Sequence, residues 1–222
     1  MLKISTVVQQ EVEASPFYSE GLKEGLINVS ALARKIQARV EKRLGKPVRE
    51  STIVMAINRL PLGELVFVER QLRQFFKKVS DISVRSNLVD YTFRNSNAML
   101  DGLPKLLAVI QNKYPTTFYS FSQGLTETTI VSTNAIQKEI DYLFHQEALL
   151  DKKENLSGIT LLLPKENRSI FGVYYFILKE LAWKGINLIE LISTSNEFTV
   201  IIHDSDLKKT FEVLNDMTKG TI

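Results

Sequence analysis

The sequence has no cysteine and only two histidines, and these absences remove several kinds of chemistry. Without cysteine the chain forms no disulfide, holds no thiolate-bound metal and has no thiol nucleophile. His145 and His203 lie far apart in the sequence, without the spacing of paired zinc ligands. We therefore expect no metal and no cofactor.

Long apolar runs are also missing. No stretch of about 18 or more apolar residues occurs, so no transmembrane helix is expected. Glu11 and Glu13 interrupt the region in which a signal peptide would need an unbroken apolar segment. These features predict a soluble, cytoplasmic protein.

The motifs of the common enzyme classes are absent as well. The sequence has no glycine-rich phosphate loop, no nucleophile elbow and no paired-histidine metal helix. Two carboxylate pairs occur, Asp204 with Asp206 and Glu11 with Glu13, but helix capping and a solvated helix face account for them. We expect that the chain is not an enzyme.

What the chain does have is an ordinary globular composition with an uneven distribution of charge. Of its 222 residues 44% are hydrophobic and 24% charged, and the length suits one large domain or two to three small ones. Residues 1–78 hold 14 of the 28 basic residues but only 8 of the 25 acidic ones, which leaves an acidic remainder. A basic head and an acidic body indicate two functions in one chain.

The body contains an internal repeat. Shifting the chain by about 70 positions places residues 89–93 on 159–163, Asn97 on Asn167 and Gly102 on Gly172, and no gap is needed between residues 89 and 131. Each copy has the pattern of a short strand, a polar loop, a glycine, an amphipathic helix, two strands and a second helix. The fold expected is α+β, with domains at 1–78, 79–150 and 151–222.

The second copy shows the pattern more clearly. It predicts a strand over 159–163, a helix over 172–184 ended by a left-handed Gly185, strands over 186–193 and 197–203, and a last helix over 206–217. A fourth strand is expected to be short or supplied by the linker. Antiparallel units of this kind pack their helices on one face of the sheet, and we expect the units to cover each other's sheet edges, either within the chain or between chains.

The second copy resembles the ACT domains in the regulatory region of aspartate kinases. The residues that carry the resemblance are Gly172-Val173, Gly185-Ile-Asn-Leu188, Ile192-Ser-Thr-Ser195 and Glu197. The family often has Pro-Gly at the helix start, where this chain has Phe171-Gly172, and the chain has no kinase catalytic region. The resemblance implies two ferredoxin-like βαββα modules that bind a small effector, an amino acid.

The resemblance also implies where the effector binds, namely at the loop between the first strand and the first helix of a module. Free backbone N–H groups at a helix N-terminus favour a carboxylate, and a glycine there allows close approach. The predicted ligand residues are Asn167, Arg168, Ser169, Ile170, Gly172 and Asn187, with Asn97 and Gly102 as counterparts in the first copy.

The basic head has the pattern of two helices joined by a short turn. An apolar stripe from Leu32 to Leu44 follows a Ser30 cap, and Gly45 ends that helix. A second helix is expected from Ser51 or Thr52 through residue 60, and residues 66–78 are expected to connect the head to the body. The arrangement fits a helix-turn-helix, with or without a wing.

Residues 34–49 hold seven basic residues against Glu41 alone, a density that attracts a phosphate backbone. The predicted nucleic-acid contacts are Arg34, Lys35, Arg39, Arg43, Lys46 and Arg49.

Three functions remain open. In the first, an effector-binding body, in a homodimer, controls a head that contacts DNA or another macromolecule. In the second, the chain is a non-catalytic regulatory subunit that docks onto a biosynthetic enzyme such as aspartate kinase. In the third, it is an interaction protein that binds no ligand.

The DNA hypothesis makes a sharp prediction. If the head binds DNA, retention on duplex DNA should weaken steeply with added salt, because phosphate contacts release counterions. Replacing Arg34, Lys35, Arg39 and Arg43 together by Ala should abolish it. Retention that ignores salt, or that survives the fourfold substitution, would contradict DNA binding.

Overall fold

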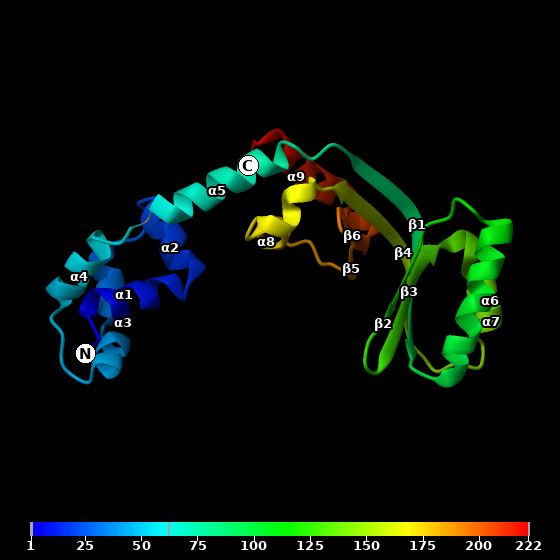
Figure 1. Cartoon of the computed structure of the whole chain (residues 1–222), viewed down its shortest axis with the longest axis horizontal. Coiled ribbons are helices and arrows are strands. Elements are labelled where there is room, and N and C mark those ends of the chain that lie inside the picture. The colour runs from blue at the N-terminus through cyan, green and yellow to red at the C-terminus, as the bar shows by residue number, and fades with distance from the viewer. Residues whose placement is uncertain (1, 62, 222) are drawn as a thin grey trace. The chain divides into compact units, whose positions relative to one another are not determined.

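The computed structural model describes residues 2–61 and 63–221, with the side chains of residues 63–69 left aside. The chain divides into two compact units, the first unit Met1–Gln71 and the second unit Leu72–Ile222. The boundary falls within helix α5, Gly63–Phe76 (Figure 1). No helix in the described part of the chain is long and apolar enough to cross a membrane.

The first unit is helical. It contains α1 (Ile4–Glu13), α2 (Pro16–Lys23), α3 (Val29–Leu44) and α4 (Glu50–Asn58). The Asn28 side chain accepts the Ala31 N–H and caps α3, and Gly45 at φ 67° ends it in the left-handed conformation that glycine adopts readily. Buried aliphatic residues from α1, α3 and α4 form the core of this unit: Val7, Val8, Val12, Leu32, Ile36, Val40, Ile53 and Ile57.

The two helices expected in the head are present as α3 and α4, but both begin at other residues than expected. The cap of α3 is Asn28 and not Ser30, and α4 begins at Glu50, before Ser51 and Thr52. Residues 2–61 include no strand, so the unit has no wing in that range. The connector expected over 66–78 is the helix α5, whose Leu72, Phe75 and Phe76 are buried.

The second unit is built on one antiparallel sheet of six strands in the order β2-β3-β1-β4-β6-β5. Two successive runs of strand, helix, strand, strand and helix supply it. The first run is β1 (Ile82–Arg94), α6 (Asn97–Lys113), β2 (Tyr119–Gln123), β3 (Glu127–Thr133) and α7 (Gln137–Leu143). The second is β4 (Leu149–Leu162), α8 (Val173–Trp183), β5 (Glu190–Ser193), β6 (Glu197–His203) and α9 (Leu207–Lys219). Short 3-10 turns precede α7, α8 and α9 at Asn134–Ile136, Lys165–Ser169 and Asp204–Asp206.

The two long strands β1 and β4 pair with each other at the centre of the sheet, so the two runs meet within the chain, one of the two arrangements that the sequence left open. Both strands are longer than expected, since β1 begins at Ile82 and β4 at Leu149. The early part of β4 pairs with β1 and so supplies the fourth strand that the first run lacks. Each strand carries one asparagine with positive φ, Asn87 at 60° and Asn155 at 58°. Asparagine tolerates this conformation better than most residues.

Helices cover the sheet beside each run, α6 and α7 next to β1 and β3, and α8 and α9 next to β4 and β6 (Figure 1). Tyr91 and Phe93 of β1 pack with Met99, Leu106 and Ile110 of α6. A separate cluster consists of Leu88, Val131, Leu156 and Ile201, one residue from each of the four central strands.

The repeat is real in its element order but its alignment differs from the sequence prediction. Leu88 and Leu156 begin identical burial patterns in β1 and β4, an offset of 68, and both pair with residues, Thr133 and His203, that are 70 apart. The ungapped shift of 70 is therefore wrong for the first strands. A strand offset by two keeps its inward and outward faces, which is why the sequence pattern hides the difference.

The pairing of Gly102 with Gly172 is also wrong. Helix α6 begins at Asn97, so Gly102 lies in its second turn and is buried, whereas Gly172 stands at φ 83° just before α8. Gly102 is required for packing, because a Cβ at this position would come within 2.5 Å of Cε1 of Phe144.

Replacing Gly102 by Ala tests this account. Inside a helix the change normally stabilises by about 0.5–1 kcal/mol, but overpacking against Phe144 costs about 1–3 kcal/mol, so the variant should be less stable. Urea unfolding followed by circular dichroism measures the difference. The control is Gly124→Ala, where the added Cβ meets only the Glu127 carbonyl oxygen at 3.6 Å. Equal or greater stability of the Gly102 variant would contradict the tight contact.

Candidate ligand-binding site

The loop that leads from β4 into α8 is fastened to the hairpin between β5 and β6. The Leu163 N–H donates to the Asn196 carbonyl (2.7 Å), and the Asn196 side chain returns a bond to the Leu163 carbonyl (3.2 Å). Asn167, only 8% exposed, donates from Nδ2 to the Ser195 carbonyl (2.8 Å), and Arg168 donates to the Ser195 hydroxyl (2.8 Å). Two of the predicted ligand residues thus hold the loop in place.

The start of α8 lies next to this fastened loop. Gly172 occupies the cap position at φ 83°, and no side chain caps the helix there. The first-turn N–H groups of α8 therefore keep the positive partial charge that favours an anion. The Tyr174 hydroxyl contacts the Ser193 hydroxyl at 2.6 Å, and its ring lies 4.9 Å from that of Phe198, so the first turn is tied to the same hairpin.

The remaining predicted residues do not all join this group. Ile170 and Ser169 belong to the loop, half-buried and exposed respectively. Asn187 follows the opposite end of α8, and an eleven-residue helix is about 16 Å long. The structure therefore places Asn187 and Gly172 at opposite ends of α8 and does not bring them together.

The first run of the repeat has a comparable loop. It is held by a residue that the alignment of the two repeat copies did not identify. Asn95 donates from Nδ2 to the Gly124 carbonyl (2.9 Å) and accepts from the Thr128 hydroxyl (2.7 Å), as Asn167 reaches the hairpin of the second run. Asn97 is instead an exposed first residue of α6, after the Ser96 cap. The only sequence signal for Asn95 was an asparagine directly after a strand.

The beginning of α8 also contacts the last turns of α5, within the second unit. A Cβ on Gly172 would lie 3.6 Å from Cδ1 of the buried Leu72, in ordinary contact. The rings of Phe76 and Phe176 stack with centroids 5.4 Å apart. A change in the conformation of the loop before α8 would therefore alter its contact with α5.

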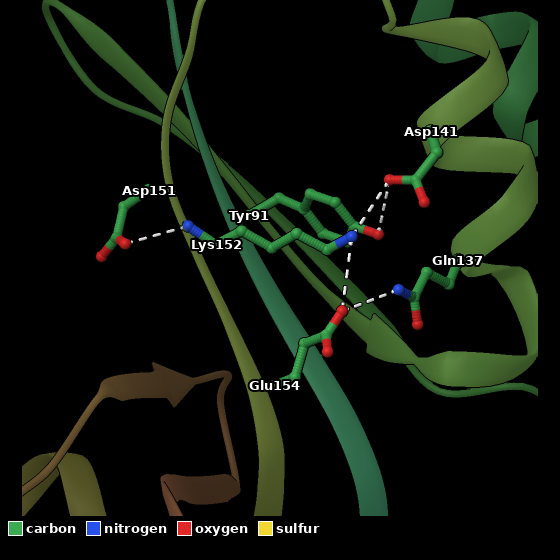
Figure 2. Close-up of polar contacts among 6 residues, drawn as sticks. All are labelled: Tyr91, Gln137, Asp141, Asp151, Lys152 and Glu154. Carbon is green, nitrogen blue, oxygen red and sulfur yellow. Dashed lines mark hydrogen bonds and ion pairs between the residues drawn. The ribbon is translucent and has the colours of Figure 1, made fainter.

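A polar network connects α7 to the central strands (Figure 2). The Tyr91 hydroxyl donates to Asp141 Oδ1 (2.9 Å), and Lys152 Nζ lies 3.4 Å from both Asp141 and Glu154. The ammonium also stands over the Tyr91 ring, 4.8 Å from its centroid. Gln137 completes the group by donating to Glu154 (2.8 Å). Burial, with the bond to Asp141, raises the pKa of Tyr91, so it stays a neutral donor.

This network is structural: it links α7 to β1 and β4, and it offers no group for chemistry. Every charge in it has a partner, and the lysine charge is matched by two carboxylates. It fastens a helix of the first run to the first residues of β4, the strand that starts the second run. Within the described residues no cluster of three or more acidic, histidine or cysteine side chains is placed to hold a metal ion.

Asp90, on the central strand β1, is a buried carboxyl group that lacks a full set of partners. It lies on β1 opposite Lys153 of β4, is 3% exposed, and its Oδ1 atom has no hydrogen-bond partner. Burial, and then the negative charge of Glu190, raise the pKa of Asp90 to about 6, although Lys153 acts in the opposite direction. The group carries a desolvation cost in its ionised form.

The basic residues of the first unit are partly neutralised. Arg34 pairs with Glu50 at 3.0 Å, and Arg39 and Arg43 both pair with Glu11, at 3.0 and 3.1 Å. These contacts fix α1 and α4 to α3 and reduce the positive charge left for a phosphate backbone. The other three predicted contacts, all exposed, are Lys35, Lys46 and Arg49. Nucleic-acid binding stays a prediction.

Comparison with known proteins gives one kind of match. No family model and no curated protein matches the chain. Among solved structures, the aspartokinase alpha and beta subunits superpose with a TM-score of 0.51 at 16% identity, over 64% of this chain and 99% of that one. The regulatory subunit of aspartate kinase from Thermus thermophilus, in its ligand-free form, gives 0.50 at 9% identity, over 63% and 97%.

The aspartate kinase of Clostridium acetobutylicum gives a TM-score of 0.51 at 12% identity over 63% of this chain, which spans only 35% of that enzyme. The first unit is about a third of the chain, so a match over 63% must include a large part of the second unit. The expectation of an aspartate-kinase regulatory fold is thus confirmed, at the level of the fold.

The raised pKa of Asp90 predicts a pH-dependent effect of Asp90→Asn. The carboxyl titrates near 6 in the folded protein and near 3.8 when unfolded, so stability from this group falls as pH rises through that window. At pH 7 the Asn variant should be the more stable, by up to about 3 kcal/mol, with the gain vanishing near pH 4. Urea unfolding at several pH values measures this. Exposed Asp101→Asn is the control, and a gain independent of pH would contradict the assignment.

Proposed function

We propose that the chain is a non-catalytic regulatory protein that binds a small effector, an amino acid, at the loop between β4 and α8. The observation that carries the proposal is the start of α8, where uncapped N–H groups follow Gly172 beside a loop fastened by Asn167. The regulatory fold of the matched aspartokinase structures supports it. In this proposal residues 79–150 and 151–222 are two ACT-like modules.

An amino acid fits the chemistry of this loop. Its carboxylate would accept from the N–H groups of the first turn of α8, and the missing side chain of Gly172 leaves the backbone open to it. Its ammonium group needs oxygen acceptors, which the loop and hairpin supply as backbone carbonyls and as the Asn167 side-chain oxygen. Arg168, Ser169 and Ile170 line the same loop. Asn187 takes no part.

The contact with α5 gives the effector a way to act on the rest of the chain. Leu72 is buried against the position of Gly172, and Phe76 stacks on Phe176 inside α8. A ligand that binds one packing of this loop more tightly than another would shift the balance between them, and equal affinity would shift nothing. Effector binding is therefore proposed to change the position of α5.

A separate observation favours a second candidate, a regulatory subunit that docks onto another protein. The match to the aspartokinase alpha and beta subunits spans 99% of that structure's chain and about 64% of this one. The match to the Thermus thermophilus regulatory subunit spans 97% of that chain and about 63% of this one. In this candidate the second unit corresponds to such a regulatory chain, and the first unit is an addition to it. In this candidate the first unit serves for docking, for instance onto a biosynthetic enzyme, and the effector site is the same.

A thermal-shift screen of the twenty amino acids tests effector binding. A ligand at about 100 times its dissociation constant should stabilise the protein by roughly 2.7 kcal/mol, visible as a raised melting temperature. Gly172→Ala should reduce or abolish the ligand-induced shift, because an alanine side chain at this positive φ alters the backbone that meets the carboxylate.

The matched control is Gly185→Ala. Gly185 has φ 67° and stands at the other end of α8, with nothing within 4 Å of an added Cβ, so it carries similar backbone strain away from the site. The control should keep the full ligand-induced shift. If no amino acid raises the melting temperature, or if both glycine variants lose the shift equally, the proposal is wrong.

A further inference from the structure

An open hollow of about 530 Å³ lies in the first run of the second unit, on different elements from the effector loop. Three segments form it: the part of β1 around Asn87, the turn between α6 and β2, and the junction of β3 with the 3-10 turn before α7. Its volume is within the range of about 300–1,000 Å³ that small-molecule sites occupy.

The charge of the hollow is entirely of one sign. Its lining includes two cations, Arg85 and Lys113, and no carboxylate. Neither cation takes part in an ion pair with another described residue. Both are exposed to solvent. Two unmatched cations on a shared concave surface favour an anion.

The nearby carboxylates are engaged elsewhere. Asp204 accepts a hydrogen bond from Ser157, whose hydroxyl lies 3.4 Å from that of the lining residue Ser86. Glu139 accepts from the hydroxyl of Tyr114 at 2.8 Å. Neither carboxylate forms an ion pair with the lysine or the arginine, although Glu139, whose Oε2 atom has no hydrogen-bond partner, lines a neighbouring hollow together with Lys113.

The arginine is held in position by packing. The guanidinium carbon of Arg85 lies 5.3 Å from the centre of the Phe118 ring, and the hydrogen bond that Arg85 donates to the Ser83 hydroxyl is long at 3.4 Å. A guanidinium stacked on a ring keeps the N–H donors on its edge for a ligand. Asn87 beside it has φ 60°, a backbone conformation that non-glycine residues adopt rarely and that is frequent at ligand sites.

We propose that this hollow is a second ligand site, which binds a small metabolite with two negative charges, one paired with Arg85 and the other with Lys113. Polar lining groups are present to take up the rest of such a ligand, among them Thr116, Thr117 and Asn134. The site is independent of the effector loop before α8, since it uses none of its residues.

Titration of the ¹⁵N-labelled full chain tests the proposal. Succinate and inorganic phosphate are the probes, one a dicarboxylate and one a phosphoryl group, and succinamide is the uncharged analogue of the first. Saturable shifts of the amide signals of residues 85–87, 113–118 and 133–135 are expected with at least one of the two anions. Which anion binds identifies the ligand class. No saturable shift with either anion, or the same shifts with succinamide or with sodium chloride at equal ionic strength, would overturn the site.

Charge-neutral variants make the test specific. Arg85→Gln and Lys113→Gln should each weaken binding about 10-fold or more, the usual effect of losing a hydrogen bond from a charged donor. The controls are Arg94→Gln on the same strand and Lys105→Gln on the same helix, both exposed and outside the hollow. Weakening by the controls as large as by the two lining variants would show a general charge effect and refute the site.

The result is separable from that of the effector proposal. Gly172→Ala should leave succinate or phosphate binding unchanged. Loss of anion binding in that variant would contradict an independent site, while absence of any amino-acid response in the thermal screen would leave it standing.

Discussion

The second unit depends on the pairing of β1 with β4. The two strands run antiparallel from Ile82 opposite Leu161 to Phe93 opposite Leu149, and they join two half-sheets into one. Each half alone would expose the edge of its longest strand, with unpaired N–H and carbonyl groups that invite association with other chains. Pairing satisfies both edges at once and leaves only the short strands β2 and β5 at the outside.

The central position of this pair explains where polar groups are buried. Asp90 lies on β1, which is hydrogen-bonded to β3 on one side and to β4 on the other. No hydrogen-bond partner reaches its Oδ1 atom. Lys152 faces the opposite way, over the Tyr91 ring, and finds two carboxylates. Burial therefore makes the Asp90 carboxyl group resist ionisation, whereas the charges around Lys152 are partly exposed and all have partners.

The two candidate ligand sites follow from the same architecture. The loop before α8 is fastened to its hairpin by Asn167 and opens at Gly172, against the buried Leu72 of α5. The charged hollow forms where β1 departs from regular geometry at Asn87 and the turn after α6 approaches it. One site lies at a helix start in the second run and the other at a helix end in the first, so a ligand at either would act on a different part of the sheet.

The sequence by itself determined the elements whose signals are local. The apolar stripe and Gly45 define α3, and a left-handed Gly185 after a helical pattern gives the end of α8, because caps and periodicity act within a few residues. The repeated element order was visible for the same reason.

Only the tertiary structure decided what depends on distant partners. The offset of 68 between β1 and β4 is set by the hydrogen bonds to β3 and β6 and by irregular residues such as Asn87, which a pattern of residue classes does not reveal. The role of Asn95, the separation of Asn187 from Gly172 and the hollow around Arg85 arise from contacts between segments far apart in the chain. Such contacts leave no periodic trace in a single sequence, because each depends on where the sheet brings another segment.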